Sequence, residues 1–168
     1  MTPLIINSQA DDHRVAKLAA LAITLHLAEA VLPSPLPGVK PGIANIVTLY
    51  ALYQYGLGTA LWVNLLRVFA VSLLFGNFLS PTFVLSLTGA LTSLAALWLT
   101  QYLSKRWFSC VTASICAAFA HIAGQLLVVW WWLIPHSGIA YLIPLFAAAA
   151  LLFGTLNGLI AAKLLATE

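Results

Sequence analysis

The chain has 168 residues, of which 62% are hydrophobic and only 7% are charged, and its formal net charge is +3. An ordinary soluble domain carries about 25% charged residues, so this composition excludes that class. It also excludes nucleic acid as a partner, because the basic residues form no patch interleaved with aromatic ones. We predict an integral membrane protein that is embedded in the lipid bilayer.

A helix that spans a membrane needs about 20 apolar residues, so the chain has room for about six such helices. Apolar runs between turn residues predict spans at 15–32, 43–55, 57–75, 82–101, 109–134 and 139–164. The second run is short for a full crossing and is expected either to tilt or to cross only in part. The predicted fold is all-α: a cytoplasmic tail at 1–14, and one six-transmembrane-helix domain at 15–168 that begins with a retained helix, not a signal peptide.

The basic residues predict the orientation of this bundle, because Lys and Arg favour the cytoplasmic side. With six crossings and a cytoplasmic N-terminus, five of them fall on that side: Arg14, Lys17, Lys105, Arg106 and Lys163. Lys40 alone then falls outside, in an external loop at 33–42. Both termini are predicted to be cytoplasmic, and the tryptophans at 130–132 are expected to anchor the outer interface.

The loop between the first two predicted helices has an unusual composition. Residues 33–46 read Pro-Ser-Pro-Leu-Pro-Gly-Val-Lys-Pro-Gly-Ile-Ala-Asn-Ile and follow Glu29, the only acid between Asp12 and Glu168. Proline removes backbone donors and glycine admits unusual dihedral angles, so the stretch is not a regular helix. We predict a shaped loop that carries Lys40 and covers a ligand. Its shaping residues include Pro37, Gly38, Pro41 and Gly42.

Polar side chains at membrane depth are costly and usually face a protein interior or a cavity. Nine occur here: His26, Glu29, Asn45, Asn64, Arg67, Asn77, His121, Gln125 and Asn157. Most of them converge on the outer half of the predicted bundle, which suits a pocket open to the outside. For Glu29 and Arg67, an internal ion pair and direct ligand contact both stay open and are compatible.

The other polar residues also have structural interpretations. His121 and Gln125 lie four residues apart on one helix face, so an interhelical hydrogen bond is the alternative to ligand contact. Asn64 and Asn157 are interpreted as helix-packing residues. One carboxylate with two nearby cations favours a ligand that carries negative charge.

Small residues recur at a spacing that lets helices approach closely. Ala16 and Ala20 form one such pair, and Gly154 and Gly158 form another. The contact can be within the chain or with another subunit, and internal packing is the default explanation. Cys110 and Cys116, six residues apart on one helix, point to different faces and are expected to be unbridged packing residues.

Motifs for catalysis are missing from the chain. It contains no phosphate-binding Gly-x-x-x-x-Gly-Lys-Ser/Thr run, no Cys/His set at metal-ligand spacing, no Gly-x-Ser-x-Gly elbow and no paired carboxylates at membrane depth. We therefore predict a protein that is not an enzyme, that uses no cofactor or metal, and that does not hydrolyse ATP itself.

Three stretches, at 32–49, 67–81 and 120–126, carry a resemblance to a known family. They resemble the Gx transporter family, often labelled heptaprenyl diphosphate synthase component I, and the likeness runs over nearly the whole chain. That family is similar to the S components of energy-coupling-factor (ECF) importers, six-helix proteins of the bacterial inner membrane. In such proteins the loop between helices one and two covers an outward-facing pocket for a vitamin-like or precursor molecule.

The resemblance also implies roles for individual residues. Pocket or pocket-support roles fall on Glu29, Lys40, Asn45, Arg67, Asn77, His121 and Gln125. Ala16 and Ala20 would contact a transmembrane coupling protein, and partner ATPases in the cytoplasm would supply the energy for uptake.

The family label suggests a different function, a non-catalytic membrane subunit associated with heptaprenyl diphosphate synthase in isoprenoid or menaquinone synthesis. Prenyl elongation needs aspartate-rich motifs that hold magnesium against diphosphate. The only aspartates here are Asp11 and Asp12, in the predicted tail. The chain could therefore at most assist another catalytic protein. A third possibility, an electron-transfer accessory, lacks any haem or iron-sulfur ligand set.

Overall fold

The computed structural model describes residues 10–31, 40–103, 109–134 and 136–167. They form six α-helices: α1 (Ala10–Val31), α2 (Ala44–Tyr55), α3 (Leu57–Leu74), α4 (Pro81–Gln101), α5 (Cys110–Val128) and α6 (Ile143–Ala166). A π-helical turn (Val129–Leu133) continues α5, and a 3-10 helix (Ser137–Leu142) leads into α6. The all-α prediction is confirmed.

Four helical segments are long and apolar enough to cross a membrane: Leu57–Leu74, Pro81–Gln101, Cys110–Leu133 and Gly138–Ala166. These segments agree with a multi-pass membrane protein. Helix α2 has 12 residues, which is about 18 Å of helix against a hydrocarbon core of about 30 Å. Helix α1 has 22 residues but carries charged side chains along its length. The crossing by all six helices and the cytoplasmic position of the termini stay predictions.

Helix α1 begins earlier than predicted. Residues 10–14, which the sequence analysis assigned to the tail, are helical. Asp11 and Asp12 occupy the first turn, where negative charge interacts favourably with the helix dipole. The Arg14 guanidinium donates to Asp11 Oδ1 at 2.8 Å and lies 4.6 Å from the ring centroid of Tyr55, which ties this end of α1 to α2.

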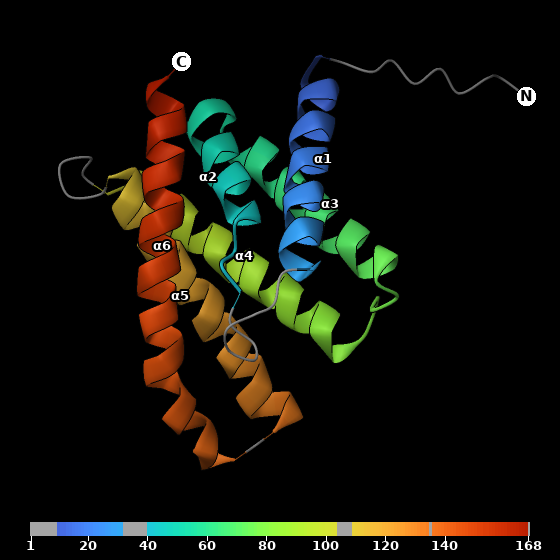
Figure 1. Ribbon diagram of the computed structural model, residues 1–168, viewed down its shortest axis with the longest axis vertical. Helices are drawn as coiled ribbons and strands as arrows, with labels where there is room; N and C mark the ends of the chain where they lie inside the picture. The colour runs from blue at the N-terminus through green and yellow to red at the C-terminus, as the bar shows by residue number, and fades with distance from the viewer. Residues whose placement is uncertain (1–9, 32–39, 104–108, 135, 168) are drawn as a thin grey trace, which may run out of the picture.

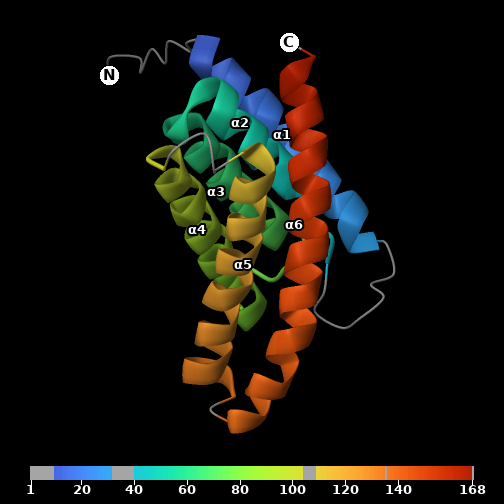
Figure 2. The ribbon, with the colours of Figure 1, turned by 90° about the vertical axis from the view of Figure 1, so that its left-hand side faces the viewer.

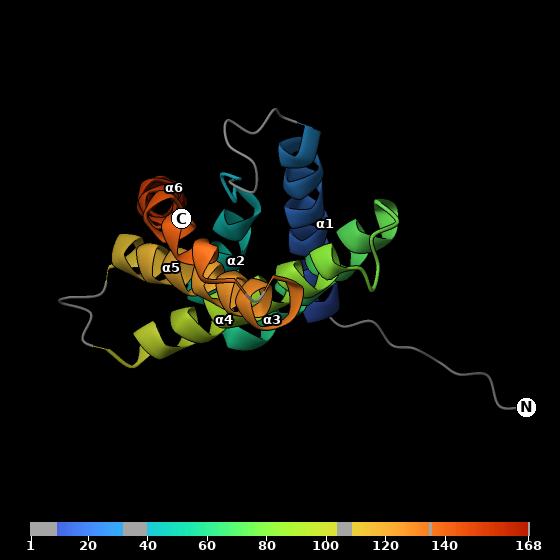
Figure 3. The same cartoon turned by 90° about the horizontal axis from the view of Figure 1, so that it is seen from below.

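The helices lie in two layers, with α1, α2 and α6 in one layer and α3, α4 and α5 in the other (Figure 3). Helices α5 and α6 run side by side and extend beyond the other helices at one end (Figures 1 and 2). The beginning of α1 and the end of α6 both lie at the opposite end of the molecule.

The α5–α6 pair is held at short range by the predicted glycine motif. A Cβ atom on Gly158 would lie 2.7 Å from Val111 Cα, and one on Gly154 would lie 2.9 Å from Ile115 Cα. Internal packing is therefore confirmed for these two glycines. Ala16 and Ala20 differ, because both are exposed on α1. For that alanine pair the default expectation of internal packing is wrong.

The larger of two buried apolar clusters in the described part of the chain occupies the half of the molecule that contains α2, and every helix contributes to it. Its members are Ala22, Ile46, Val47, Leu49, Ala51, Leu52, Ala60, Val63, Leu94, Leu97, Ala113, Ala117 and Ala161. Large apolar side chains are exposed on the outside, for example Leu152, Leu156 and Leu159 of α6, as expected for a surface that faces lipid. Cys110 and Cys116 are free thiols, so the prediction of no bridge between them is confirmed.

Candidate functional site

A cavity of about 540 Å³ lies between the core and the end of the α5–α6 pair, a volume that suits a small-molecule site. All seven residues that were predicted for the pocket line it: Glu29, Lys40, Asn45, Arg67, Asn77, His121 and Gln125. Two of the predicted lid residues, Pro41 and Gly42, line it as well. The other two, Pro37 and Gly38, lie outside the described residues. The structure therefore brings the predicted set together around one space.

Glu29 is buried near the end of α1 and holds the beginning of α2. Its carboxylate accepts hydrogen bonds from the backbone N–H of Gly42 and, at 3.1 Å, from that of Ile43. The first N–H groups of a helix have no partner within the helix, and a negative charge also suits this end of the helix dipole. Gly42 has a φ of +69°, in the left-handed region that favours glycine. The carboxylate thus fixes the geometry where the loop enters α2.

Arg67 of α3 is also buried, with an exposed fraction of 4%. Its Nη1 donates to Asn45 Oδ1 at 2.9 Å and its Nη2 donates to Asn64 Oδ1 at 2.6 Å. Its Nε has no hydrogen-bond partner. Among the described residues, no carboxylate oxygen lies within salt-bridge distance of this guanidinium.

The Glu29–Arg67 ion pair, one of the two interpretations of these residues, is therefore absent. The physical reason is that the Glu29 carboxylate is occupied by two backbone N–H groups, while two neutral amide oxygens take the terminal nitrogens of Arg67. A buried charge is costly unless an opposite charge or strong hydrogen bonds compensate it. The described residues that line the cavity include two cations, Lys40 and Arg67, and one anion, Glu29. Their formal charges therefore sum to +1.

Asn157 of α6 belongs to the site, which corrects its interpretation as a packing residue only. Its Nδ2 donates to the carbonyl oxygens of Pro41 at 3.0 Å and Gly42 at 3.2 Å, and it lines the cavity. Because Glu29 and Asn157 bind the same short segment, the entry to α2 is held from both α1 and α6. Asn64 does not line the cavity: its Nδ2 donates to Ala90 O at 3.0 Å, so its packing interpretation agrees with the structure.

His121 and Gln125 of α5 both face α4. Gln125 Nε2 lies 3.4 Å from Leu85 O, which is a long interhelical hydrogen bond. His121 Nδ1 is buried and has no partner. The imidazole rests on Gly89, where a Cβ atom would lie 2.7 Å from Nε2. Gly89 is thus a supporting residue that sequence reasoning missed, because a single glycine inside an apolar helix gives no local signal of what it contacts.

Two further groups complete the surroundings. His26 lines the cavity and could have been included on the same signal as the others, a polar side chain at membrane depth. A second cavity of about 20 Å³, lined by Thr48, Ser93 and Ser114 among others, adjoins Asn45 and Asn157. Among the described residues, no group of three His, Cys, Asp or Glu side chains could hold a metal ion.

The comparisons with known proteins give one match. A family model described as heptaprenyl diphosphate synthase component I matches residues 18–164, which is most of the chain. No curated protein and no solved structure matches.

Proposed function

We propose that the chain, which belongs to the heptaprenyl diphosphate synthase component I family, is the substrate-binding membrane component of an uptake system for a small molecule that carries an anionic group. The observation that carries the proposal is Arg67. It is a buried cation at the wall of a cavity of ligand size, its two hydrogen-bond acceptors are neutral amide oxygens, and no carboxylate oxygen of the described residues lies within salt-bridge distance of it. An acidic group of a ligand would place a negative charge beside this guanidinium, whose direct partners are neutral.

The proposal includes an outward-facing cavity and a lid formed by the loop at 33–42. What supports a lid is the anchoring of its last residues, since Glu29 and Asn157 both bind the Pro41–Gly42 segment. Lys40 follows the undescribed part of this loop, is exposed, and lines the cavity.

Energy for uptake would come from partner proteins in the bacterial inner membrane. We assign the contact with a transmembrane coupling protein to Ala16 and Ala20, because both are exposed on α1 and small side chains let a partner helix approach closely. Cytoplasmic ATPases would act through that coupling protein.

Native mass spectrometry of the full chain released from lipid nanodiscs tests the proposal. We expect the wild-type protein to retain a small anionic molecule, and Arg67→Gln to lose it because the compensating cation is gone. The control is Lys163→Gln, which removes an exposed cation at the end of α6 and should retain the molecule. Equal retention by all three proteins would contradict the proposal.

The family name supports a second candidate, a non-catalytic subunit that assists a prenyl diphosphate synthase. The chain has two aspartates, Asp11 and Asp12, and both are exposed at the beginning of α1. Co-purification from native membranes separates the candidates. Recovery of a prenyl synthase catalytic subunit, with no ATPase or coupling protein, would favour this second function over uptake.

A further inference from the structure

We propose that the ligand is an elongated amphipathic anion, whose acidic group binds at Arg67 and whose apolar body lies along α6. This inference rests on the proposed function and adds the class of molecule to it. It depends on the distribution of side chains around the cavity, which is polar near Arg67 and apolar along α6.

The polar end of the cavity holds a buried cation and two nitrogens that have no hydrogen-bond partner. Arg67 Nε and His121 Nδ1 are both buried, both lack a partner, and both belong to residues that line the cavity. Guanidinium groups bind carboxylate and phosphate oxygens strongly because the hydrogen bonds are charge-assisted. Lys40 adds a second cation at the same cavity.

The apolar wall is one stripe of α6. Phe146, Ala149, Ala150 and Phe153 line the cavity, and their spacing of three, one and three residues places them on a single helix face. Asn157 continues the same stripe by one more turn and donates to the carbonyl oxygens of Pro41 and Gly42. The stripe therefore changes from polar at the loop that Glu29 binds to apolar farther along α6.

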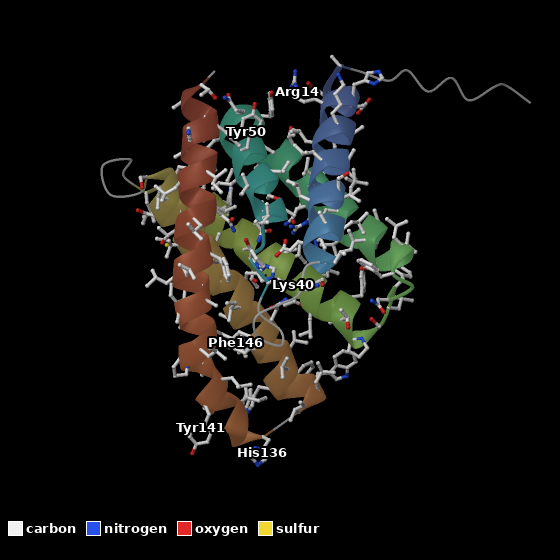
Figure 4. All side chains as sticks on the ribbon, in the orientation of Figure 1. Arg14, Lys40, Tyr50, His136, Tyr141 and Phe146 are labelled. Carbon is white, nitrogen blue, oxygen red and sulfur yellow. The ribbon has the colours of Figure 1, made fainter. Side chains whose placement is uncertain are left out.

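The length of this wall decides between a compact and an elongated ligand. From Phe146 to Phe153 the apolar stripe covers seven steps of 1.5 Å, about 10 Å, and Asn157 lies four steps, about 6 Å, farther along α6. Figure 4 shows Phe146 between Lys40 and the end of the molecule that carries His136 and Tyr141. Helix α5 contributes Ile122 and Leu126 to the lining, and the π-helical turn that continues it contributes Val129. An inorganic anion bound at Arg67 would make no contact with this apolar part of the cavity.

The apolar end also reaches the surface of the protein. Ile134 and Leu142 line the cavity and are about half exposed. Ile134 follows the tryptophans at 130–132 closely in the chain, and these are exposed too. An apolar chain can therefore extend toward this end while its acidic group stays at Arg67.

The test is a set of binding titrations of the full chain in lipid nanodiscs, followed by tryptophan fluorescence, with four probes: inorganic phosphate, octyl phosphate, octanoate and octanol. Empty nanodiscs correct for partition into lipid. Burial of a methylene strengthens binding about fourfold, so we expect octyl phosphate to bind at least 100-fold more tightly than inorganic phosphate. Comparing the affinities for octanoate and octyl phosphate shows whether the site prefers a carboxylate or a phosphate. Octanol, which has no acidic group, should show no saturable binding.

Variants locate the two parts of the ligand. Ala149→Phe fills the apolar part of the cavity and should lower the affinity for octyl phosphate at least 10-fold. The control is Leu152→Phe, on the exposed face of the same helix, which should leave this affinity unchanged. Arg67→Gln and Arg67→Lys should both lower the affinity for the anionic probes, and the loss should be smaller for Arg67→Lys because it keeps a positive charge. Saturable binding of inorganic phosphate that needs Arg67 but gains nothing from the octyl chain would overturn the amphipathic ligand and leave the proposed function standing. If neither octyl phosphate nor octanoate showed saturable binding, the proposal of an amphipathic ligand would be overturned as well.

Discussion

Helices α5 and α6 meet through glycines, whereas α1, α2 and α3 share an apolar core and are also joined by buried polar side chains. At the first junction, Gly154 and Gly158 let the backbones approach so closely that a Cβ atom would clash with α5. At the second, Glu29 binds the backbone before α2, and Arg67 binds Asn45. In lipid, apolar surface gives little drive for association, so close packing and hydrogen bonds must hold helices together. The glycine junction thus fixes the backbones of α5 and α6, both of which line the cavity, and the polar junction adds the buried charges of the candidate site.

The largest effect is expected at the glycine junction. Gly158→Leu would push α5 from α6, because a Cβ at this position already falls 2.7 Å from backbone atom Val111 Cα. We expect a loss of about 3 kcal/mol in the free energy of unfolding, at the upper end for overpacking. Unfolding by SDS in mild detergent measures it. Gly58→Leu is the control, because nothing lies within 4 Å of a Cβ there, and equal losses would contradict the packing argument.

At the polar junction, Glu29→Ala removes the acceptor for two backbone N–H groups and frees the entry to α2. A buried donor without a partner costs about 1–3 kcal/mol, so we expect a loss of about 2 kcal/mol in the same unfolding measurement. Glu29→Gln, which keeps one acceptor oxygen, should lose less. The control is Asp11→Ala, which breaks the exposed ion pair with Arg14 and should change stability by under about 0.5 kcal/mol. If Asp11→Ala lowered the free energy of unfolding as much as Glu29→Ala, the stabilising role of the Glu29 hydrogen bonds would be contradicted.

Asn157 links the two junctions, because it lies on α6 and binds the loop that precedes α2. Asn157→Ala should cost about 1 kcal/mol, the net value of a typical hydrogen bond, and should weaken ligand binding by releasing the Pro41–Gly42 segment. The two readouts are unfolding by SDS and ligand retention by native mass spectrometry. Thr155→Ala on the same helix loses only a bond from its hydroxyl to Leu151 O and serves as the control. Full ligand retention by Asn157→Ala would mean that the loop anchor has no role in binding.

The smallest effect on stability is expected on the free face of α1. Ala16→Leu and Ala20→Leu add apolar bulk at exposed positions, so the free energy of unfolding should change by less than about 0.5 kcal/mol. If these alanines contact a coupling protein, both variants should retain ligand and yet lose uptake in cells. Thr24→Leu, one turn farther along the exposed side of α1, shows how far the contact surface extends. Normal uptake by both alanine variants would contradict the assignment of this contact to Ala16 and Ala20.

Much of the fold could be predicted because its signals are local. Apolar runs and the turn residues between them placed every helix to within a few residues, except for the beginning of α1. The polar residues at membrane depth were expected to converge, and all seven of the predicted pocket residues line the cavity. Burial of polar groups in lipid is so costly that their presence in the sequence already indicates a shared interior space.

The partners of these residues could not be predicted in the same way. Glu29 was paired with a cation or a ligand in every interpretation, yet it binds the backbone of Gly42 and Ile43. A carboxylate can satisfy several kinds of donor, and the sequence does not say which donor is nearest. Asn157 and Pro41 lie 116 positions apart, beyond the reach of any local pattern.

The two small-residue pairs show the division most clearly. By itself the sequence determined that this is a helical membrane protein with a polar interior, because hydropathy and turn residues act within each segment. It also marked both pairs as places of close approach. Only the tertiary structure decided that Gly154 and Gly158 face α5 while Ala16 and Ala20 face outward. The rotation of each helix about its axis depends on all its neighbours at once, and that same packing gave Arg67 two amide oxygens, not a carboxylate, as its hydrogen-bond acceptors.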